Sequence, residues 1–261
     1  MLLAIDVGNS QTHLGVFRRD ELAHEWRIST REARTADELA LIFGDFLALA
    51  GLSFDNEITG VAISSVVPRA TQELRSMTLR YFGFAAVVVE PGTKTGVAVA
   101  TDNPREVGAD RIVNAVAASA LYAGEPVVIV DFGTAITVDA VSARGEYLGG
   151  AIAPGIETAA TALFQSTAQI RRVELVAPAH AIGKNTVTAV QSGIVFGTAA
   201  LVDGLVEQVS KELGGSARVV ATGGAAGAVI QHSNRIEQVE PHLTLQGLKL
   251  IFELNAVRTA S

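Results

Sequence analysis

The chain contains no cysteine, and few of its 261 residues are aromatic. The lack of a thiol excludes disulfides, thiolate nucleophiles and zinc–thiolate sites together. Aromatic residues make up 5% of the chain and hydrophobic residues 49%, so Ala, Val, Leu and Ile must build the interior. The length allows one large domain or two of moderate size, each with an ample core.

The chain also has no surplus of basic residues, because its formal net charge is −7 and its pI is near 5.3. Binding to a phosphate backbone needs a basic face, so we expect no nucleic-acid partner. No apolar run approaches the roughly 20 residues of a membrane helix, and no secretory signal is visible at Met1. The five histidines lack a metal-binding spacing. We therefore expect a cytoplasmic protein without a membrane span.

One phrase occurs twice in the chain. Asp6-Val7-Gly8-Asn9-Ser10 and Asp131-Phe132-Gly133-Thr134-Ala135 each follow a short apolar run and precede another, at 14–17 and 136–141. This pattern predicts two hairpins, each with Asp-x-Gly at the end of a buried strand. The repeat suggests two half-domains facing one nucleotide.

The residues of these hairpin turns suit a phosphate. Gly8 and Gly133 have no Cβ, so backbone amides can approach an anion, and Ser10, Thr12 and Thr134 add hydroxyl donors. The aspartates would hold a cation that bridges to phosphate oxygens, since a carboxylate repels phosphate directly. The alternative is an ordinary turn in which Asp accepts backbone hydrogen bonds, but two matched copies favour phosphate binding.

Other segments predict the elements around the hairpins. Thr35 and Glu38 form a capping box that opens a helix, and an Ala-rich helix over about 112–122 follows a polar segment. The remaining predictions are strands at 25–30, 58–67, 87–90 and 218–221, a turn at 149–155, and helices at 71–81, 186–213 and 248–257.

Asp110 and Arg111 are the strongest catalytic candidates. Phosphoryl transfer needs a group that takes the proton of the acceptor hydroxyl and a group that neutralises phosphate charge. Asp110 suits the first task, Arg111 suits the second, and Gly108 leaves room for a ligand. The alternative is a helix N-cap beside a solvated arginine.

Two glycine-containing phrases in the second half are further candidates. Thr222-Gly223-Gly224 follows a strand and could lie flat against adenine or ribose, or could be a helix-entry turn. Gly183-Lys184-Asn185-Thr186 lacks the Walker A pattern; Lys184 could touch phosphate, and Thr186 could simply cap the next helix.

The paired hairpins with a late Thr-Gly-Gly resemble the acetate and sugar kinase, Hsp70 and actin superfamily. More specific phrases, over residues 1 to about 250, look like type III pantothenate kinase. They are Asp6 to Ser10, Ser64-Ser65-Val66-Val67-Pro68, Asp102-Asn103-Pro104 with Gly108-Ala109-Asp110-Arg111, Asp131 to Ala135, Gly149-Gly150 with Pro154-Gly155, and Gly183 to Thr186 with Gln191-Ser192-Gly193.

The resemblance implies a fold of two ribonuclease-H-like domains. Each would be a mixed β-sheet flanked by helices, as in actin-like ATPases, with the nucleotide in the cleft between them. The N-terminal domain would cover 1–115 with the first phosphate loop. The C-terminal domain would cover 116–261 with the second phosphate loop and the adenosine motif.

The resemblance also implies a reaction, in which ATP phosphorylates pantothenate to 4′-phosphopantothenate, the first step of coenzyme A biosynthesis, with Asp110 as general base. Asp131 would hold potassium or ammonium, Asp6 would hold Mg²⁺ through water, and members of the family are homodimers. The residues implied to bind ATP and its phosphates are Asp6, Val7, Gly8, Asn9, Ser10, Gln11, Thr12, His13, Thr134 and Gly223. Those implied to bind pantothenate are Gly108, Ala109, Asp110, Arg111 and Thr186.

The sequence departs from the family at two positions. Ser10 stands where threonine is common and keeps the hydroxyl, while Thr101 stands where many members have an aromatic residue that walls the pantothenate pocket. Two other functions compete. Another small-molecule kinase would share the ATP hairpins, but Gly108 to Arg111 argues against it. A non-catalytic relative would not need the base that Asp110 provides.

Overall fold

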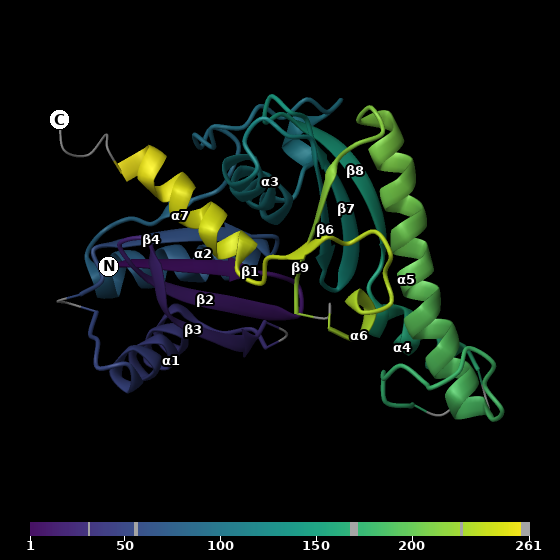
Figure 1. Cartoon of the computed structure of the whole chain (residues 1–261). Coiled ribbons are helices and arrows are strands. Elements are labelled where there is room, and N and C mark those ends of the chain that lie inside the picture. The colour runs from purple at the N-terminus through teal and green to yellow at the C-terminus, as the bar shows by residue number, and fades with distance from the viewer. Residues whose placement is uncertain (31, 55–56, 168–171, 225–226, 257–261) are drawn as a thin grey trace. The chain divides into compact units, whose positions relative to one another are not determined.

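The structure is a computed structural model that describes residues 1–30, 32–54, 57–167, 172–224 and 227–256 (Figure 1). The chain folds into two compact units. Unit 1 comprises 1–98, 102–117 and 243–261, and unit 2 comprises 99–101 and 118–242.

Unit 1 contains a five-stranded sheet. Its strands are β1 (Leu2–Val7), β2 (Gln11–Arg18), β3 (Glu21–Ser29), β4 (Gly60–Ser65) and β5 (Val87–Val88). Their order across the sheet is β3-β2-β1-β4-β5. The β1–β2 and β2–β3 pairs are antiparallel, and the β1–β4 and β4–β5 pairs are parallel. The predicted first hairpin is therefore confirmed, and β1 lies at the centre of the sheet.

Helices cover both faces of this sheet (Figure 1). They are α1 (Ala36–Leu49), α2 (Pro68–Met77), which continues as a π-helical turn at Thr78–Phe82, α3 (Ala109–Leu121) and α7 (Leu243–Ala256), and a short 3₁₀ turn lies at Pro104–Glu106. One apolar core, which includes Leu3, Ile5 and Phe43, joins the sheet to α1 and α2. The other, which includes Ala4, Val113 and Leu248, joins the opposite face to α3 and α7.

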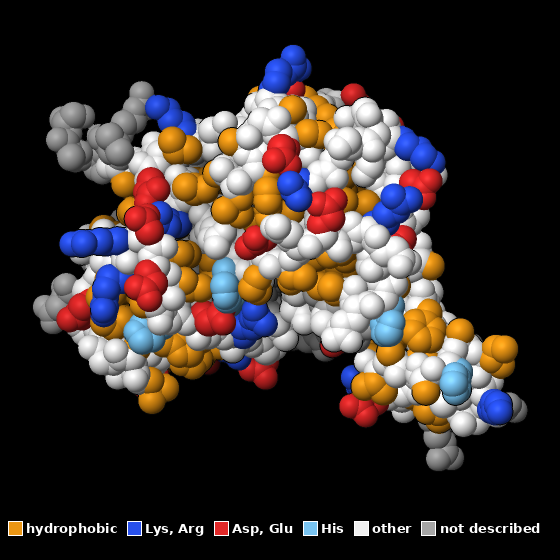
Figure 2. All heavy atoms as spheres, in the orientation of Figure 1, with side chains coloured by type: hydrophobic (Ala, Val, Ile, Leu, Met, Phe, Trp, Pro, Cys, Tyr) orange, Lys and Arg blue, Asp and Glu red, His pale blue; other side chains and the backbone are white. Residues whose placement is uncertain are grey.

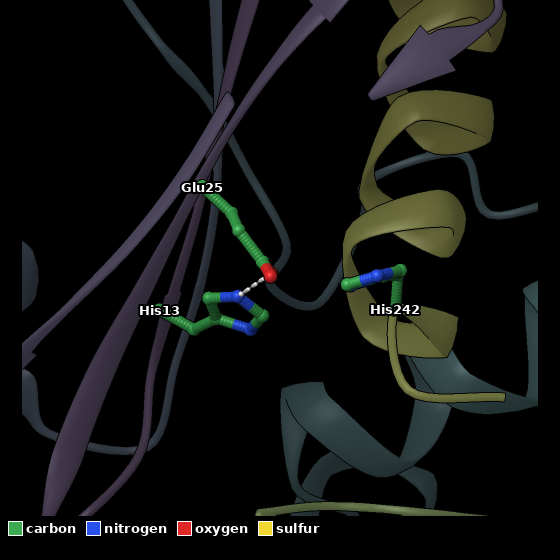
Figure 3. Close-up of side chains that lie close together, drawn as sticks. All are labelled: His13, Glu25 and His242. Atoms are coloured by element: carbon green, nitrogen blue, oxygen red, sulfur yellow. Dashed lines mark hydrogen bonds and ion pairs between the residues drawn. The ribbon is translucent and has the colours of Figure 1, made fainter. Parts of the chain in front are cut away.

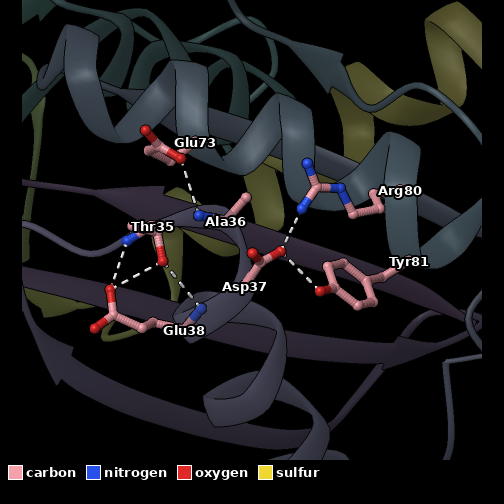
Figure 4. A network of polar contacts seen from close by, with 7 residues as sticks. All are labelled: Thr35, Ala36, Asp37, Glu38, Glu73, Arg80 and Tyr81. Atoms are coloured by element: carbon pink, nitrogen blue, oxygen red, sulfur yellow. Dashed lines mark hydrogen bonds and ion pairs between the residues drawn. The ribbon is translucent and has the colours of Figure 1, made fainter.

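The N-terminus of α1 is held by the predicted capping box (Figure 4). The Thr35 side chain accepts from the Glu38 amide, and the Thr35 amide donates to the Glu38 carboxylate at 2.8 Å. This amide, followed by the Thr35 hydroxyl, keeps the pKa of Glu38 below its usual value. The Ala36 amide donates to Glu73 of α2 at 2.9 Å. These contacts fix the start of α1 against α2.

Unit 2 repeats the sheet of unit 1. Its strands are β6 (Val127–Phe132), β7 (Ala135–Val141), β8 (Tyr147–Pro154), β9 (Arg218–Thr222) and β10 (Gln238–Val239). Their order, β8-β7-β6-β9-β10, matches that of unit 1 strand for strand, with the same succession of antiparallel and parallel pairs. The second predicted hairpin and the duplication of the fold are confirmed.

The helices of unit 2 are α4 (Ile156–Ser166), α5 (Thr186–Glu212) and α6 (Gly227–Ile230). One face of the sheet packs on α5 through a core that includes Val130, Val138 and Val202. By length and composition alone, α5 could cross a membrane, and 33% of its most apolar window is buried inside the molecule. A single such helix also occurs in many proteins without a membrane span, so its composition is no evidence that α5 spans a membrane. Lys, Arg, Asp and Glu side chains are interspersed on the face drawn in Figure 2.

Two predicted elements were wrong in type or extent. Residues 149–154 of the segment predicted as a turn form the end of β8, and Gly155 is the N-cap of α4. Gly150 pairs with Asp139 on β7 at a place where a Cβ would meet the Val138 carbonyl at 2.1 Å. The last helix begins at Leu243, earlier than predicted, and packs on the sheet of unit 1. The compact units thus differ from the predicted domains in the placement of α7, and the boundary at 115/116 stays a prediction.

Candidate active site

The first candidate loop joins β1 to β2. The Gly8 amide donates to the Gln11 carbonyl at 3.0 Å and closes a tight turn. A Cβ at position 8 would lie 3.2 Å from that carbonyl oxygen, so glycine suits the turn. Asn9 is exposed at the tip, and Ser10 is half-buried. Backbone amides and a hydroxyl therefore lie at one accessible end of the sheet.

The strand register places Asp6 among polar neighbours. Asp6 is the penultimate residue of β1 and pairs with His13 on β2 and with Ser64 on β4. Residues paired directly across strands share a face, so these three side chains lie on the face that α3 and α7 cover. Ser64 is completely buried, and its hydroxyl has no hydrogen-bond partner in the part of the chain that the structure describes.

His13 is held by a carboxylate. Its Nε2 lies 2.8 Å from a carboxylate oxygen of Glu25 on β3, and the two side chains point toward each other in Figure 3. His242, drawn in the same figure, ends unit 2. The Glu25 contact orients the imidazole on the same face of the sheet as Asp6.

Thr12 points to the other face. It pairs with Val7 on β1, whose side chain belongs to the core under α1 and α2, and its hydroxyl lies 2.7 Å from that of Thr30. Residues 6–13, predicted as one phosphate loop, therefore divide between the two faces of the sheet. Val7 is buried and Gln11 is exposed. The strand alternation causes this division.

The second candidate loop joins β6 to β7 in the corresponding place. The Gly133 amide donates to the Ala135 carbonyl at 3.0 Å. Asp131 is the penultimate residue of β6, as Asp6 is of β1, and it pairs with Thr137 on β7 and Thr222 on β9. The carboxylate thus has hydroxyl-bearing residues on both neighbouring strands.

Gly223 packs directly on this strand. Its φ is +96°, and a Cβ there would lie 2.5 Å from the Phe132 carbonyl and 2.6 Å from a carboxylate oxygen of Asp131. Only glycine tolerates both the backbone angle and the close approach. The structure therefore brings the predicted adenosine motif and the predicted cation ligand together.

Thr134 lies at the tip of the second loop and is exposed. Its carbonyl accepts from the Gly155 amide at 3.0 Å and from the Thr158 hydroxyl of α4 at 2.7 Å. A Cβ at Gly155 would lie 2.5 Å from the Thr134 carbonyl oxygen. The N-terminus of α4 thus holds the loop in place, and the Thr134 side chain remains accessible.

Asp110 lies in the first turn of α3, because Ala109 is the first residue of that helix. It is the second helical residue, so the alternative N-cap role is wrong. One carboxylate oxygen accepts from the Arg111 amide at 2.8 Å. A Cβ at Gly108 would lie 2.5 Å from that oxygen, so the glycine leaves the carboxylate its place. Asp110 and Arg111 are both half-buried.

Thr186 borders an open pocket of about 570 Å³ in unit 2. The pocket is lined by Gly183 to Thr186 and by apolar residues of α4 and α5, among them Leu163, Val190 and Ile194. Asn185, whose side chain accepts from the Thr188 amide, is the N-cap of α5, so the idea that Thr186 caps the helix is wrong. The Thr186 side chain is exposed beside the pocket.

The predicted residues thus fall into separate groups. Asp6 and His13 share one face in unit 1, Asp131 and Gly223 are in contact in unit 2, and Thr186 lies at its own pocket. Ser64 is a candidate site residue that was not predicted from the sequence. Its signal was a hydroxyl at the end of a buried apolar strand, but only the register with Asp6 makes it significant.

Duplicated sheets of this order, flanked by helices, define a ribonuclease-H-like fold, and solved structures agree. The chain matches the ROK hexokinase of Thermus thermophilus with a TM-score of 0.53, 15% identity and coverage of 98% of this chain and 99% of that one. It matches component A of the (R)-2-hydroxyglutaryl-CoA dehydratase of Acidaminococcus fermentans with a TM-score of 0.58, 15% identity and coverage of 99% and 98%. These likenesses establish the fold class.

The family follows from the sequence comparisons. The model of the type III pantothenate kinase family matches residues 2–208. Type III pantothenate kinases of Frankia alni and Streptomyces coelicolor are 53% and 52% identical, over 98% and 99% of this chain and 100% of each relative. That of Moorella thermoacetica is 51% identical over 98% of this chain. The chain belongs to the type III pantothenate kinase family.

Proposed function

We propose that this protein transfers the γ-phosphoryl group of ATP to the primary hydroxyl of pantothenate, the first step of coenzyme A biosynthesis, in the cytoplasm. The full-length identity of about half to type III pantothenate kinases carries the proposal. The two Asp-x-Gly hairpins at corresponding places of a duplicated sheet support the use of ATP, because each presents backbone amides at a strand end.

Asp110 is the general base of the proposed reaction. Its carboxylate takes the proton of the pantothenate hydroxyl as the hydroxyl oxygen bonds to the γ-phosphorus and the bond to the β,γ-bridging oxygen breaks, which releases ADP. The position in the first turn of α3, partly accessible, with Gly108 leaving space for the carboxylate, supports this role. Arg111 neutralises charge on the substrates.

The loops bind the nucleotide in this proposal. Gly8 to Gln11 and His13 bind its phosphates on unit 1, while Thr12 lies on the other face of the sheet, and Thr134 and Gly223 contact ATP on unit 2. Pantothenate is bound by Gly108 to Arg111 and by Thr186. The pocket of about 570 Å³ at Thr186, with apolar walls and a lysine at its edge, is large enough for part of such an amphipathic acid.

Two cations complete the proposed site. Oxygen ligands suit both Mg²⁺ and potassium, and the residues present offer them: a carboxylate beside a buried hydroxyl at Asp6 and Ser64, and a carboxylate between threonines at Asp131. Asp6 holds Mg²⁺ through water, and Asp131 holds potassium or ammonium. The cations supply positive charge against the phosphates.

The first experiment measures ADP release from ATP and Mg²⁺ with pantothenate, with and without potassium, and with acetate and glucose as acceptor controls. Turnover should require pantothenate. The Asp110→Asn variant should keep ATP affinity within about threefold and lose turnover by at least roughly 100-fold, because general-base catalysis contributes about 10²–10⁴-fold. A variant that loses binding and turnover equally would contradict the base assignment.

The cation site is tested with Asp131→Ala in the same assay. Removing the carboxylate should abolish activation by potassium and raise the KM for ATP, since phosphate charge is then less well balanced. Glu212→Ala, which removes an exposed carboxylate at the end of α5, serves as the control that should retain potassium activation. Persistent activation of Asp131→Ala by potassium would place the ion elsewhere.

We also propose a homodimer. Helix α5 is apolar over most of its length, yet Val187 and Leu201 are 49% and 41% exposed, so it has apolar surface for a partner. Sedimentation equilibrium should give twice the chain mass of 27.2 kDa, and a monomer at micromolar concentration would refute the proposal.

A further inference from the structure

A second, smaller pocket lies within unit 1, on the face of the sheet opposite to Asp6. Its volume is about 220 Å³. It is bounded by the start of β2, the end of β3 and the N-terminal ends of α1 and α2, and its walls include Thr12, Thr30, Arg34, Leu39, Arg69 and Ala70. The strand alternation that directs Thr12 away from Asp6 separates this pocket from the face proposed for nucleotide phosphates.

The walls of this pocket are mainly apolar with a polar rim. Ile28, Leu39 and Ala70 provide aliphatic surface, and the hydroxyls of Thr12 and Thr30 lie 2.7 Å apart. Pockets for drug-sized ligands are about 300–1,000 Å³. This one suits a smaller molecule that has an apolar body.

The charge on the rim is positive. Arg69 is exposed and forms no ion pair among the described residues. Arg34 lies closer to the wall, with 17% of its side chain exposed, where it donates to the Ser29 carbonyl and pairs with Glu32 at 2.9 Å. The rim therefore carries two guanidinium groups and one carboxylate. Because Glu32 pairs with Arg34, Arg69 remains available for an anion.

The two helix ends at the pocket differ in how they are capped. At the start of α1, the capping box satisfies the Thr35 and Glu38 amides and Glu73 satisfies the Ala36 amide (Figure 4). Helix α2 has no side-chain cap, since Val67 is its N-cap and Pro68 its first residue. The uncapped end adds its partial positive charge beside Arg69. An anion would therefore lie at α2 rather than at α1.

Hydrogen bonds join the two helices that border the pocket. Asp37 near the start of α1 accepts from Arg80 and from the Tyr81 hydroxyl, at the end of the chain segment that continues α2 (Figure 4). The Tyr81 hydroxyl, and then Arg80, lower the pKa of Asp37, so this link persists at neutral pH. These hydrogen bonds therefore fix the positions of α1 and α2 beside the pocket.

We propose that this pocket binds a small organic carboxylate with a short branched aliphatic body. The carboxylate contacts the Arg69 guanidinium and the N-terminus of α2, and the aliphatic body lies against Ile28 and Leu39. Inorganic phosphate would satisfy the charge but would leave the apolar walls uncovered. Binding at this pocket does not depend on the proposed kinase reaction.

The test uses 3-methylbutanoate as the probe and the full chain labelled for amide NMR. Titration at constant ionic strength should give saturable shifts of the amide resonances of Thr12, Thr30 and Ala70. Acetate and inorganic phosphate should bind at least about tenfold more weakly, since each buried CH₂ adds about 0.8 kcal/mol. Failure of 3-methylbutanoate to saturate, or equal affinity for phosphate, would overturn the proposal.

Matched variants locate the binding. Arg69→Gln should weaken 3-methylbutanoate roughly tenfold, the scale of one charge-assisted hydrogen bond. Arg18→Gln removes another exposed arginine of unit 1 at the far end of β2, about 20 Å from Thr12 along the strand, and should change nothing. Ala70→Leu, which fills the pocket, should abolish binding while the rest of the spectrum is retained. Equal effects of the two arginine variants would mean nonspecific charge attraction and refute the site.

Discussion

Replacing Gly223 with alanine tests how closely the chain packs at the end of β6. Gly223 has a φ of +96°, and a Cβ would lie 2.5 Å from the Phe132 carbonyl oxygen and 2.6 Å from a carboxylate oxygen of Asp131. The unfavourable backbone angle costs about 1–2 kcal/mol for a residue with a Cβ. The overlap with a backbone carbonyl, which cannot move aside as a side chain can, adds about 1–3 kcal/mol.

Gly214 provides a matched control for that prediction. Its φ is +97°, and a Cβ there would meet nothing within 4 Å. Gly214→Ala should therefore incur only the backbone cost, and the difference between the two variants isolates the packing against β6. Urea unfolding followed by circular dichroism measures both. Equal destabilisation of the two variants would refute the close packing that the structure places at Asp131.

Two further predictions concern buried and exposed polar groups. Tyr147→Phe should destabilise the protein by about 1–3 kcal/mol, because the completely buried Asp139 loses a hydrogen bond of 2.8 Å. Tyr122→Phe should destabilise it less, because the Tyr122 hydroxyl forms its hydrogen bond at a partly exposed edge. Equal shifts of the two variants in the urea midpoint would contradict this difference. Glu38 has a lowered pKa through Thr35, so its stabilising contribution is complete above its usual pKa of 4.5 and is lost as the pH falls through the lowered value. Glu38→Gln should therefore reduce the dependence of the melting temperature on pH between about pH 5 and 3, measured by thermal melting. A pH dependence equal to that of the unmodified protein would refute the capping role.

The local elements were predictable because their signals are local. Asp-x-Gly between two apolar runs predicts a hairpin, and Thr35 with Glu38 predicts a helix start, since turn closure and capping involve neighbours in sequence. The turn predicted at 149–155 was wrong for the same reason. Its glycines indicate a turn locally, but Gly150 is needed where β8 approaches the Val138 carbonyl of β7.

The grouping of the candidate site residues depends on strand pairing that the sequence does not state. Ser64 becomes a neighbour of Asp6 only because β4 pairs with β1 in one register, and a shift of one residue would turn Ser64 to the other face. Contact between Gly223 and Asp131 likewise requires β9 beside β6.

The sequence by itself determined the hairpins, the duplicated fold and the family, because these follow from local patterns and from long stretches of shared residues. Only the tertiary structure decided that α7 packs with unit 1, that residues 6–13 divide between two faces, and that a pocket forms behind Thr12. The physical reason is that these features arise from packing between segments far apart in the chain, where burial and register, rather than local preference, select the arrangement.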